Sequence, residues 1–153
     1  MPFLDHTEHP DIPVFMNITF AVGKNGANVR DDVAWVQFLL EKFYSKKNVI
    51  INTRGTTKTF TRPKGEITRD GICGPITNNW ILKFQLDLNQ SGAFLVADGR
   101  VDRALIKAGQ GKQSVVGANS HLAYTIVALN FFYKLNFPKD FEIDFSEPVF
   151  ETT

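Results

Sequence analysis

The stretch that decides the fold runs from Asp70 to Gln85 and reads DGICGPITNNWILKFQ. Its first two residues favour a sharp turn, because Asp can bond forward to backbone N–H groups and Gly accepts a positive φ. Pro75 then stands at the first position of a predicted helix, where a missing N–H costs nothing. We expect this helix to run to about Asn89 and to end at Gly92. Its apolar stripe is formed by Trp80, Ile81, Phe84 and Leu88.

The same kind of turn occurs a second time. Asp70–Gly74 (DGICG) and Asp98–Asp102 (DGRVD) are similar five-residue units that begin 28 residues apart. Each places an Asp-Gly turn before a hydrophobic residue and a helix start. The second unit therefore predicts a short helix from Arg103 to Ala108, which Asp102 caps and Gly109 ends.

Upstream of the first turn the sequence predicts a strand, a helix and a hairpin. The even positions from Val14 to Val22 are all apolar, which predicts a strand with one buried face. Asn28 opens an Asx form of the capping box and predicts a helix from about Val29 to Tyr44. The segment Ser45–Arg69 breaks the helical pattern, and its β-branched runs predict a hairpin or an extended loop.

Downstream of the second turn we expect one further helix and a strand. The helix is predicted from Ser120 to about Leu135, and Pro138 is expected to terminate it. Apolar and acidic residues alternate from Phe141 to Phe145, which predicts a short acidic strand paired with the N-terminal strand.

Three of these stretches, taken together, resemble the motifs of the peptidoglycan-binding-like domain. Asp32–Leu40 (DVAWVQFLL) is similar to the first-helix motif of that family, and Asp70–Gln85 is similar to its second motif. Asp98–Val101 is similar to its third, shorter copy. The resemblance covers roughly residues 23–108 and implies three helices joined by Asp-Gly turns, used as a non-catalytic module that binds bacterial murein.

The fold class expected from this resemblance is mainly α. It is an orthogonal three-helix bundle with an extra C-terminal helix and a small β element from the terminal strands and the 45–69 insertion. Residues 1–153 are expected to form one domain. Its core is 23–108, and 109–153 packs on that core.

Eight residues are candidate ligand contacts around a saccharide-peptide groove: Arg69, Asp70, Gly71, Thr77, Trp80, Asp98, Gly99 and Arg100. The alternative for the Asp-Gly turns is a purely architectural role, in which Phe84 fills the core and Gln85 bonds to a nearby loop. Trp35 and Trp80 could serve as sugar platforms, but their helical spacing favours core packing.

A net charge of +1 hides two oppositely charged segments. Residues 42–69 hold one acid, Glu66, and eight basic residues, whereas residues 136–153 hold five acids and Lys139. The basic residues are Lys42, Lys46, Lys47, Arg54, Lys58, Arg62, Lys64 and Arg69. This asymmetry indicates either an anionic partner, such as a wall polymer, or two patches that face each other. The acidic segment is also rich in Phe and is a candidate surface for a protein partner.

The residues that could carry chemistry are few. Cys73 is the only cysteine, which excludes an intramolecular disulfide and a thiolate zinc site built from this chain alone. The segment His6–Asp11 is interpreted as a flexible terminus and not as a metal site. The sequence contains no serine elbow, phosphate loop or paired-carboxylate pattern, so we expect no enzyme, cofactor or metal. Nucleic acid is not an expected partner, because the pI is about 7.9 and the basic segment has a single aromatic residue, Phe60.

Residues 1–14 have neither a basic n-region nor an apolar h-region, so we expect no signal peptide and a chain that is cytoplasmic as synthesised. The periplasm or cell wall would then be reached by another export route or by lysis. No apolar run approaches the ~18 residues of a membrane span.

Two functional hypotheses follow. The first is non-catalytic binding of peptidoglycan or a related wall polymer, either alone or as the targeting part of a hydrolase whose catalytic subunit is another chain. The second is a protein-interaction or assembly subunit that keeps the scaffold and has lost glycan binding.

Overall fold

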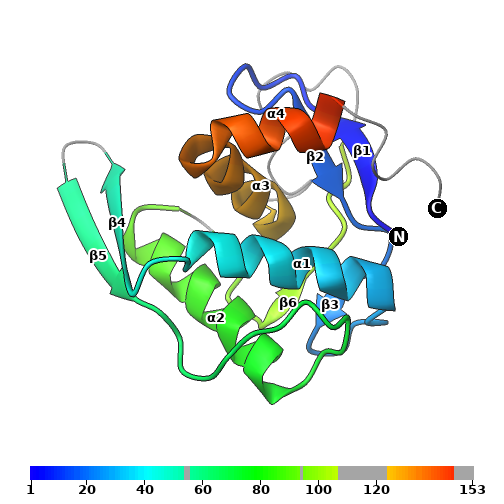
Figure 1. The fold of residues 1–153 in the computed structure, drawn as a ribbon, viewed down its shortest axis with the longest axis horizontal. Helices are drawn as coiled ribbons and strands as arrows, with labels where there is room; N and C mark the ends of the chain where they lie inside the picture. The colour runs from blue at the N-terminus through cyan, green and yellow to red at the C-terminus, as the bar shows by residue number, and fades with distance from the viewer. Residues whose placement is uncertain (54–55, 94, 107–123, 147–153) are drawn as a thin grey trace.

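The computed structural model describes residues 1–53, 56–93, 95–106 and 124–146 (Figure 1). Its helices are α1 (Arg30–Phe43), α2 (Pro75–Gln90), α3 (Thr125–Asn136) and α4 (Pro138–Ser146). Its strands are β1 (Phe3–His6), β2 (Val14–Asn17), β3 (Val22–Gly23), β4 (Asn48–Thr53), β5 (Thr56–Thr61) and β6 (Arg100–Val101). The strands form three antiparallel pairs, β1–β2, β3–β6 and β4–β5.

The fold class is mixed α/β, so the predicted three-helix bundle with a small β element is wrong. Among the described residues, the four helices contain 51 residues and the six strands contain 24. Some strands are too short to be recognised from the sequence. β3 and β6 have two residues each, and so they show no hydrophobic period that a sequence pattern can detect.

α1 is the central element, as Figure 1 shows by its place between α3 and α2. Two of its faces are buried: Trp35 is 6% exposed and Leu40 is fully buried. The indole N–H of Trp35 donates to the Met16 carbonyl at 3.2 Å, which ties α1 to β2. The Asn130 amide donates to the same carbonyl at 3.0 Å and so joins α3 to this contact.

The strand predicted from Val14 to Val22 is interrupted. β2 ends at Asn17 and β3 begins at Val22, and the chain between them crosses the start of α1. The buried Asp32 carboxylate accepts N–H bonds from Thr19 at 3.3 Å and Phe20 at 3.0 Å. These bonds satisfy backbone groups that a continuous strand would have paired in a ladder.

The short helix predicted from Arg103 is wrong over residues 103–106, which are not helical. The side-chain amide of Asn17 takes both backbone groups of Ala104: its Oδ1 accepts the N–H at 3.1 Å, and its Nδ2 donates to the carbonyl at 2.9 Å. In a helix the Ala104 N–H and carbonyl would bond to other backbone groups, so this contact disfavours a helix at Ala104. Residues 107–108, the rest of that prediction, lie outside the described residues, as do residues 120–123 at the start of the next predicted helix.

The strand predicted over Phe141–Phe145 is also wrong, because α4 occupies these residues. Pro138 begins α4 as well as following α3, and the Phe141 N–H donates to the Phe137 carbonyl at 2.9 Å. Phe141 packs against Tyr133 of α3, with ring centroids 6.0 Å apart. The N-terminal strand β1 pairs with β2 instead.

The segment 45–69 does contain a hairpin, as predicted, with Asn48 paired to Thr61 and Ile51 to Lys58. α1 and α2 begin and end within one or two residues of their predicted bounds. Among the described residues, no helix has the length and apolar character needed to cross a membrane.

Candidate functional site

A buried glutamine of α1 holds the first Asp-Gly turn. Gln37 is 1% exposed, and its Oε1 accepts the Gly71 N–H at 2.9 Å. Its Nε2 donates to Asp70 Oδ1 at 3.1 Å, to the Ile72 carbonyl at 3.0 Å and to Thr77 Oγ1 at 3.1 Å. One amide thus connects α1, the turn and the first turn of α2.

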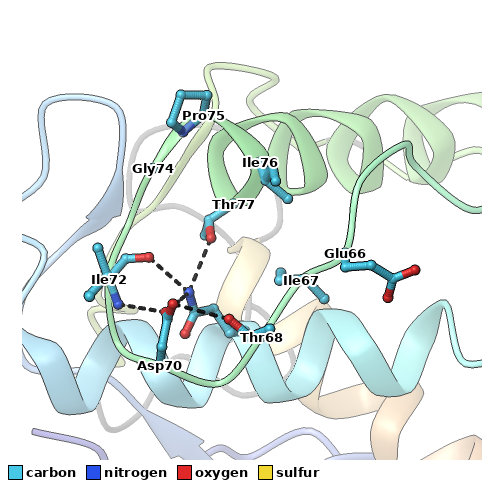
Figure 2. A pocket seen from close by; sticks show the side chains of 10 residues that line it. Glu66, Ile67, Thr68, Asp70, Ile72, Gly74, Pro75, Ile76 and Thr77 are labelled. Atoms are coloured by element: carbon cyan, nitrogen blue, oxygen red, sulfur yellow. Dashed lines mark hydrogen bonds between the residues drawn. The ribbon is translucent and has the colours of Figure 1, made fainter.

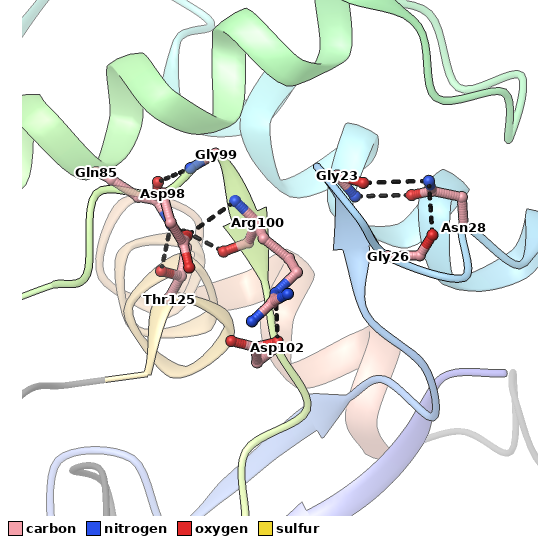
Figure 3. Close-up of polar contacts among 9 residues, drawn as sticks. All are labelled: Gly23, Gly26, Asn28, Gln85, Asp98, Gly99, Arg100, Asp102 and Thr125. Carbon is pink, nitrogen blue, oxygen red and sulfur yellow. Dashed lines mark hydrogen bonds and ion pairs between the residues drawn. The ribbon is translucent and has the colours of Figure 1, made fainter.

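A buried glutamine of α2 holds the second turn in the same way (Figure 3). Gln85 is fully buried, and its Oε1 accepts the Gly99 N–H at 2.9 Å. Its Nε2 donates to Asp98 Oδ1 at 3.4 Å, to the Arg100 carbonyl at 2.9 Å and to Thr125 Oγ1 at 3.1 Å. The predicted bond from Gln85 to a nearby loop is therefore confirmed.

We call these two arrangements the first and second glutamine knots. Each consists of a helix glutamine, an Asp-Gly turn and the first-turn threonine of the next helix. Each turn aspartate also accepts the N–H two residues ahead, from Ile72 at 2.9 Å and from Arg100 at 3.0 Å. Both turn glycines have positive φ, +75° at Gly71 and +73° at Gly99. The repeat seen in the sequence is thus a repeated structural joint between consecutive helices.

The surroundings of Asp70 stabilise its charged form. The Ile72 N–H and the Gln37 amide hold the pKa of the Asp70 carboxyl below its ordinary value of 3.8, and the Thr68 hydroxyl adds a third bond at 3.0 Å. Asp70 is nevertheless exposed, so its outer lone pairs face solvent.

A groove of about 210 Å³ lies beside the first knot (Figure 2). Its sides are formed by residues 66–68 of the segment before the turn, by Ile72 and by residues 74–77 at the start of α2. Ile72 and Ile76 are 69% and 44% exposed, whereas Ile67 is 8% exposed and forms part of the apolar wall. Glu66, Thr68 and Asp70 bring oxygen atoms to the same groove.

The eight candidate contacts have different positions relative to this groove. Asp70 and Thr77 line it, and the buried Gly71 lies next to Asp70 in the turn. The Arg69 guanidinium lies over the Phe38 ring at 4.1 Å, so this exposed cation is held against α1. Trp80 is 2% exposed and donates its indole N–H to the Lys64 carbonyl at 3.2 Å, which matches the favoured interpretation of core packing.

The second turn contributes to a different part of the surface. Asp98 and Gly99 belong to the second knot, and the Lys24 N–H donates to the Gly99 carbonyl at 3.0 Å. Arg100 forms an ion pair with Asp102, its Nε 2.9 Å from Oδ1 but not aligned for a hydrogen bond. None of Asp98, Gly99 and Arg100 lines the groove of the first knot.

The loop between β3 and α1 bonds to the second turn through the Lys24 N–H. Asn28, with φ of +54°, holds this loop through its side-chain amide, which bonds Gly23 N–H at 2.7 Å and the carbonyls of Gly23 and Gly26, each at 3.1 Å (Figure 3). It is not the helix cap that the sequence predicts, because α1 begins after Val29 with no side-chain cap.

Burial raises the pKa of the Cys73 thiol, which lies 3.2 Å from Asn78 Oδ1. This does not favour a reactive thiolate.

Sequence reasoning missed eight residues that line the groove: Gln37, Glu66, Ile67, Thr68, Ile72, Gly74, Pro75 and Ile76. The isoleucines on either side of the Asp70-Gly71 turn could have indicated an apolar groove, but apolar residues next to a turn are usually assigned to the core. Within the described residues, no group of three or more His, Cys, Asp or Glu side chains could hold a metal ion.

Comparisons of this chain with protein-family models, with curated proteins and with solved structures gave no match.

Proposed function

We propose that this protein is a non-catalytic binding module for peptidoglycan or a related bacterial wall polymer, and that the groove beside the first glutamine knot is its binding site. The observation that carries the proposal is the exposure of Ile72 and Ile76 at a groove that also contains the oxygen atoms of Thr68 and Asp70. Exposed apolar side chains next to convergent polar groups are typical of ligand sites.

The size and chemistry of the groove favour one unit of an extended chain. Its volume of about 210 Å³ is below the ~300 Å³ of pockets that enclose a whole small molecule. The isoleucines can cover the apolar face of a sugar or the methyl group of a short side chain. The oxygens of Glu66, Thr68 and Asp70 can accept bonds from hydroxyl and amide N–H groups.

The flanks of the groove carry positive charge. Lys64 and Arg69 are exposed on the segment that leads into the turn. Murein stem peptides bear carboxylates, and Arg and Lys attract such groups and steer their approach. We therefore expect binding to weaken as salt is raised.

Co-sedimentation with purified sacculi tests the proposal. The groove variant is Ile72→Ser/Ile76→Ser, and its matched control is Val96→Ser/Leu105→Ser, because those two side chains are 51% and 58% exposed outside the groove. We expect the groove variant to lose about tenfold in affinity, since two apolar contacts are removed. Equal retention of the two variants, or retention of the wild type no better than that of an unrelated domain of equal charge, would contradict the proposal.

A second candidate function is that of an assembly subunit, and exposed leucines of α2 favour it. Leu82 and Leu86 lie four residues apart on one helix face and are 37% and 47% exposed. Size-exclusion chromatography with light scattering discriminates between the two functions. A dimer that Leu82→Ser/Leu86→Ser converts to monomer supports assembly, and a monomer that binds sacculi supports the wall module.

A further inference from the structure

A second hollow, of about 230 Å³, lies at the base of the β4–β5 hairpin, where β4 meets the junction of α3 and α4. It shares none of the lining residues of the groove of the first knot. Phe43, Val49 and Phe137 give it an apolar wall, and Lys42 and Lys46 bring positive charge to it. We call this site the hairpin cleft.

The cations of the hairpin cleft have no carboxylate partner among the described residues. The Lys42 ammonium lies over the rings of Phe137 at 4.8 Å and Phe38 at 5.6 Å, where aromatic faces attract it. Lys46 is exposed, as are Lys47 and Lys58 on and beside the hairpin, and every described ion pair joins other residues. The region therefore presents a concentrated positive potential toward solvent.

The lining itself contains no acid. Besides the two lysines, its polar side chains are Ser45, Asn48 and Asn136, which can bond to carboxylate or amide groups. Ile50 extends the apolar surface at the edge of the cleft and is 65% exposed. The cleft is thus built for an occupant that is both negatively charged and partly apolar.

We propose that the hairpin cleft binds an acidic peptide segment of a protein partner, with an aromatic or large aliphatic side chain seated against Phe43, Val49 and Phe137. Carboxylates beside that side chain would pair with Lys42 and Lys46. The volume fits one such side chain but not a whole drug-sized ligand. A phosphate-rich polymer would satisfy the lysines but would leave the apolar wall uncovered, so the acidic peptide matches the cleft better.

A chemical-shift titration of the full-length, isotope-labelled protein tests this site. The probe is the blocked peptide Glu-Glu-Phe-Glu-Glu, with Glu-Glu-Ala-Glu-Glu and Lys-Lys-Phe-Lys-Lys as comparison peptides. We expect the first peptide to shift the amides of Lys46 and Asn48. The alanine peptide should bind about tenfold more weakly, because it cannot bury an aromatic ring. The lysine peptide should not bind.

Variants of the protein then separate the cleft from a general charge effect. Lys42→Met/Lys46→Met keeps the long side chains and removes both charges, and we expect it to weaken binding of Glu-Glu-Phe-Glu-Glu about tenfold. The control, Lys24→Met, removes an exposed lysine outside the cleft and should change affinity by about twofold or less. Urea denaturation of each variant checks that it is folded.

Three results would overturn the proposal: no binding of Glu-Glu-Phe-Glu-Glu, equal binding of the alanine peptide, or equal losses in the Lys24→Met control and the double variant. None of these results would contradict the proposal of sacculus binding, because the groove of the first knot shares no lining residue with the hairpin cleft.

Discussion

The two glutamine knots have the same internal bonds but different surroundings. In each knot one buried glutamine accepts the glycine N–H and donates to the aspartate, to a turn carbonyl and to a threonine. The second knot is bonded to the loop after β3, since the Lys24 N–H donates to the Gly99 carbonyl. The first knot has the groove beside it, with the Ile72 side chain 69% exposed.

This difference separates the structural role of the motif from any binding role. The bonds common to both knots join helices, and a joint alone does not need an exposed isoleucine. What belongs to the first knot alone is the groove and its apolar side chains, and for this reason we place ligand binding there. The shared hydrogen bonds should therefore contribute equally to the free energy of unfolding in the two knots, whereas only the first knot should bind a ligand.

The largest effect is expected from removing either glutamine. Gln37→Leu and Gln85→Leu each leave a buried glycine N–H and several other polar groups without their partner, so each should lower the free energy of unfolding by about 3 kcal/mol. Urea denaturation measures both losses. The exposed Gln90→Leu is the control and should change stability by about 0.5 kcal/mol or less. A loss in one knot without a similar loss in the other would show that the two joints are not equivalent.

The turn glycines should respond unequally. Both have positive φ, so alanine costs about 1 kcal/mol at either site. At Gly71 an added Cβ would also lie 2.8 Å from the Arg30 carbonyl oxygen and 2.4 Å from Arg30 Cγ, whereas at Gly99 its nearest atom is Lys24 Cβ at 3.9 Å. We therefore expect Gly71→Ala to cost about 3 kcal/mol and Gly99→Ala about 1 kcal/mol. Thermal unfolding of the pair tests this order, and an equal loss would contradict it.

A smaller effect is expected from the charge of Asp70. Its pKa in the folded protein lies below the ordinary 3.8, so its charge stabilises the fold above that pH, and the contribution is lost as pH falls through the folded pKa. Asp70→Asn should thus reduce stability at neutral pH and have no effect well below the folded pKa. A carboxyl titration by NMR measures the pKa directly. A value at or above 3.8 would contradict the hydrogen-bond geometry described for the first turn.

The smallest effect on stability is expected from the exposed residues beside the turns. Ile72→Ser and Val96→Ser remove side chains that are 69% and 51% exposed, so each should change the free energy of unfolding by about 0.5 kcal/mol or less. The two variants should differ only in sacculus binding. A large loss of stability in Ile72→Ser alone would mean that this side chain serves the fold and not a ligand.

Parts of the fold that depend on neighbours in sequence could be predicted. α1 and α2 follow from their apolar stripes, and Pro75 and Gly92 mark the ends of α2. The hairpin follows from its β-branched runs. The Asp-Gly turns also follow from local chemistry, because both glycines have positive φ.

The features that sequence reasoning missed depend on distant partners. Residues 103–106 are not helical, and Asn17, 87 residues before Ala104, binds both backbone groups of Ala104. The alternating apolar and acidic residues of 141–145 predict a strand, but they form α4, in which Phe141 packs against Tyr133 of α3. The groove was missed because it forms where the 66–68 segment lies against the start of α2, and no local pattern encodes that arrangement.

The most direct test of the central claim is a chemical-shift titration of the labelled protein with soluble murein fragments. If the first knot carries the binding site and the second is purely structural, the amides of Thr68, Ile72 and Ile76 will shift, and those of Val96, Gly99 and Arg100 will not. In Ile72→Ser/Ile76→Ser the same shifts should need about tenfold more ligand. Shifts centred on the second turn, or no shifts in the folded protein at all, would contradict the account.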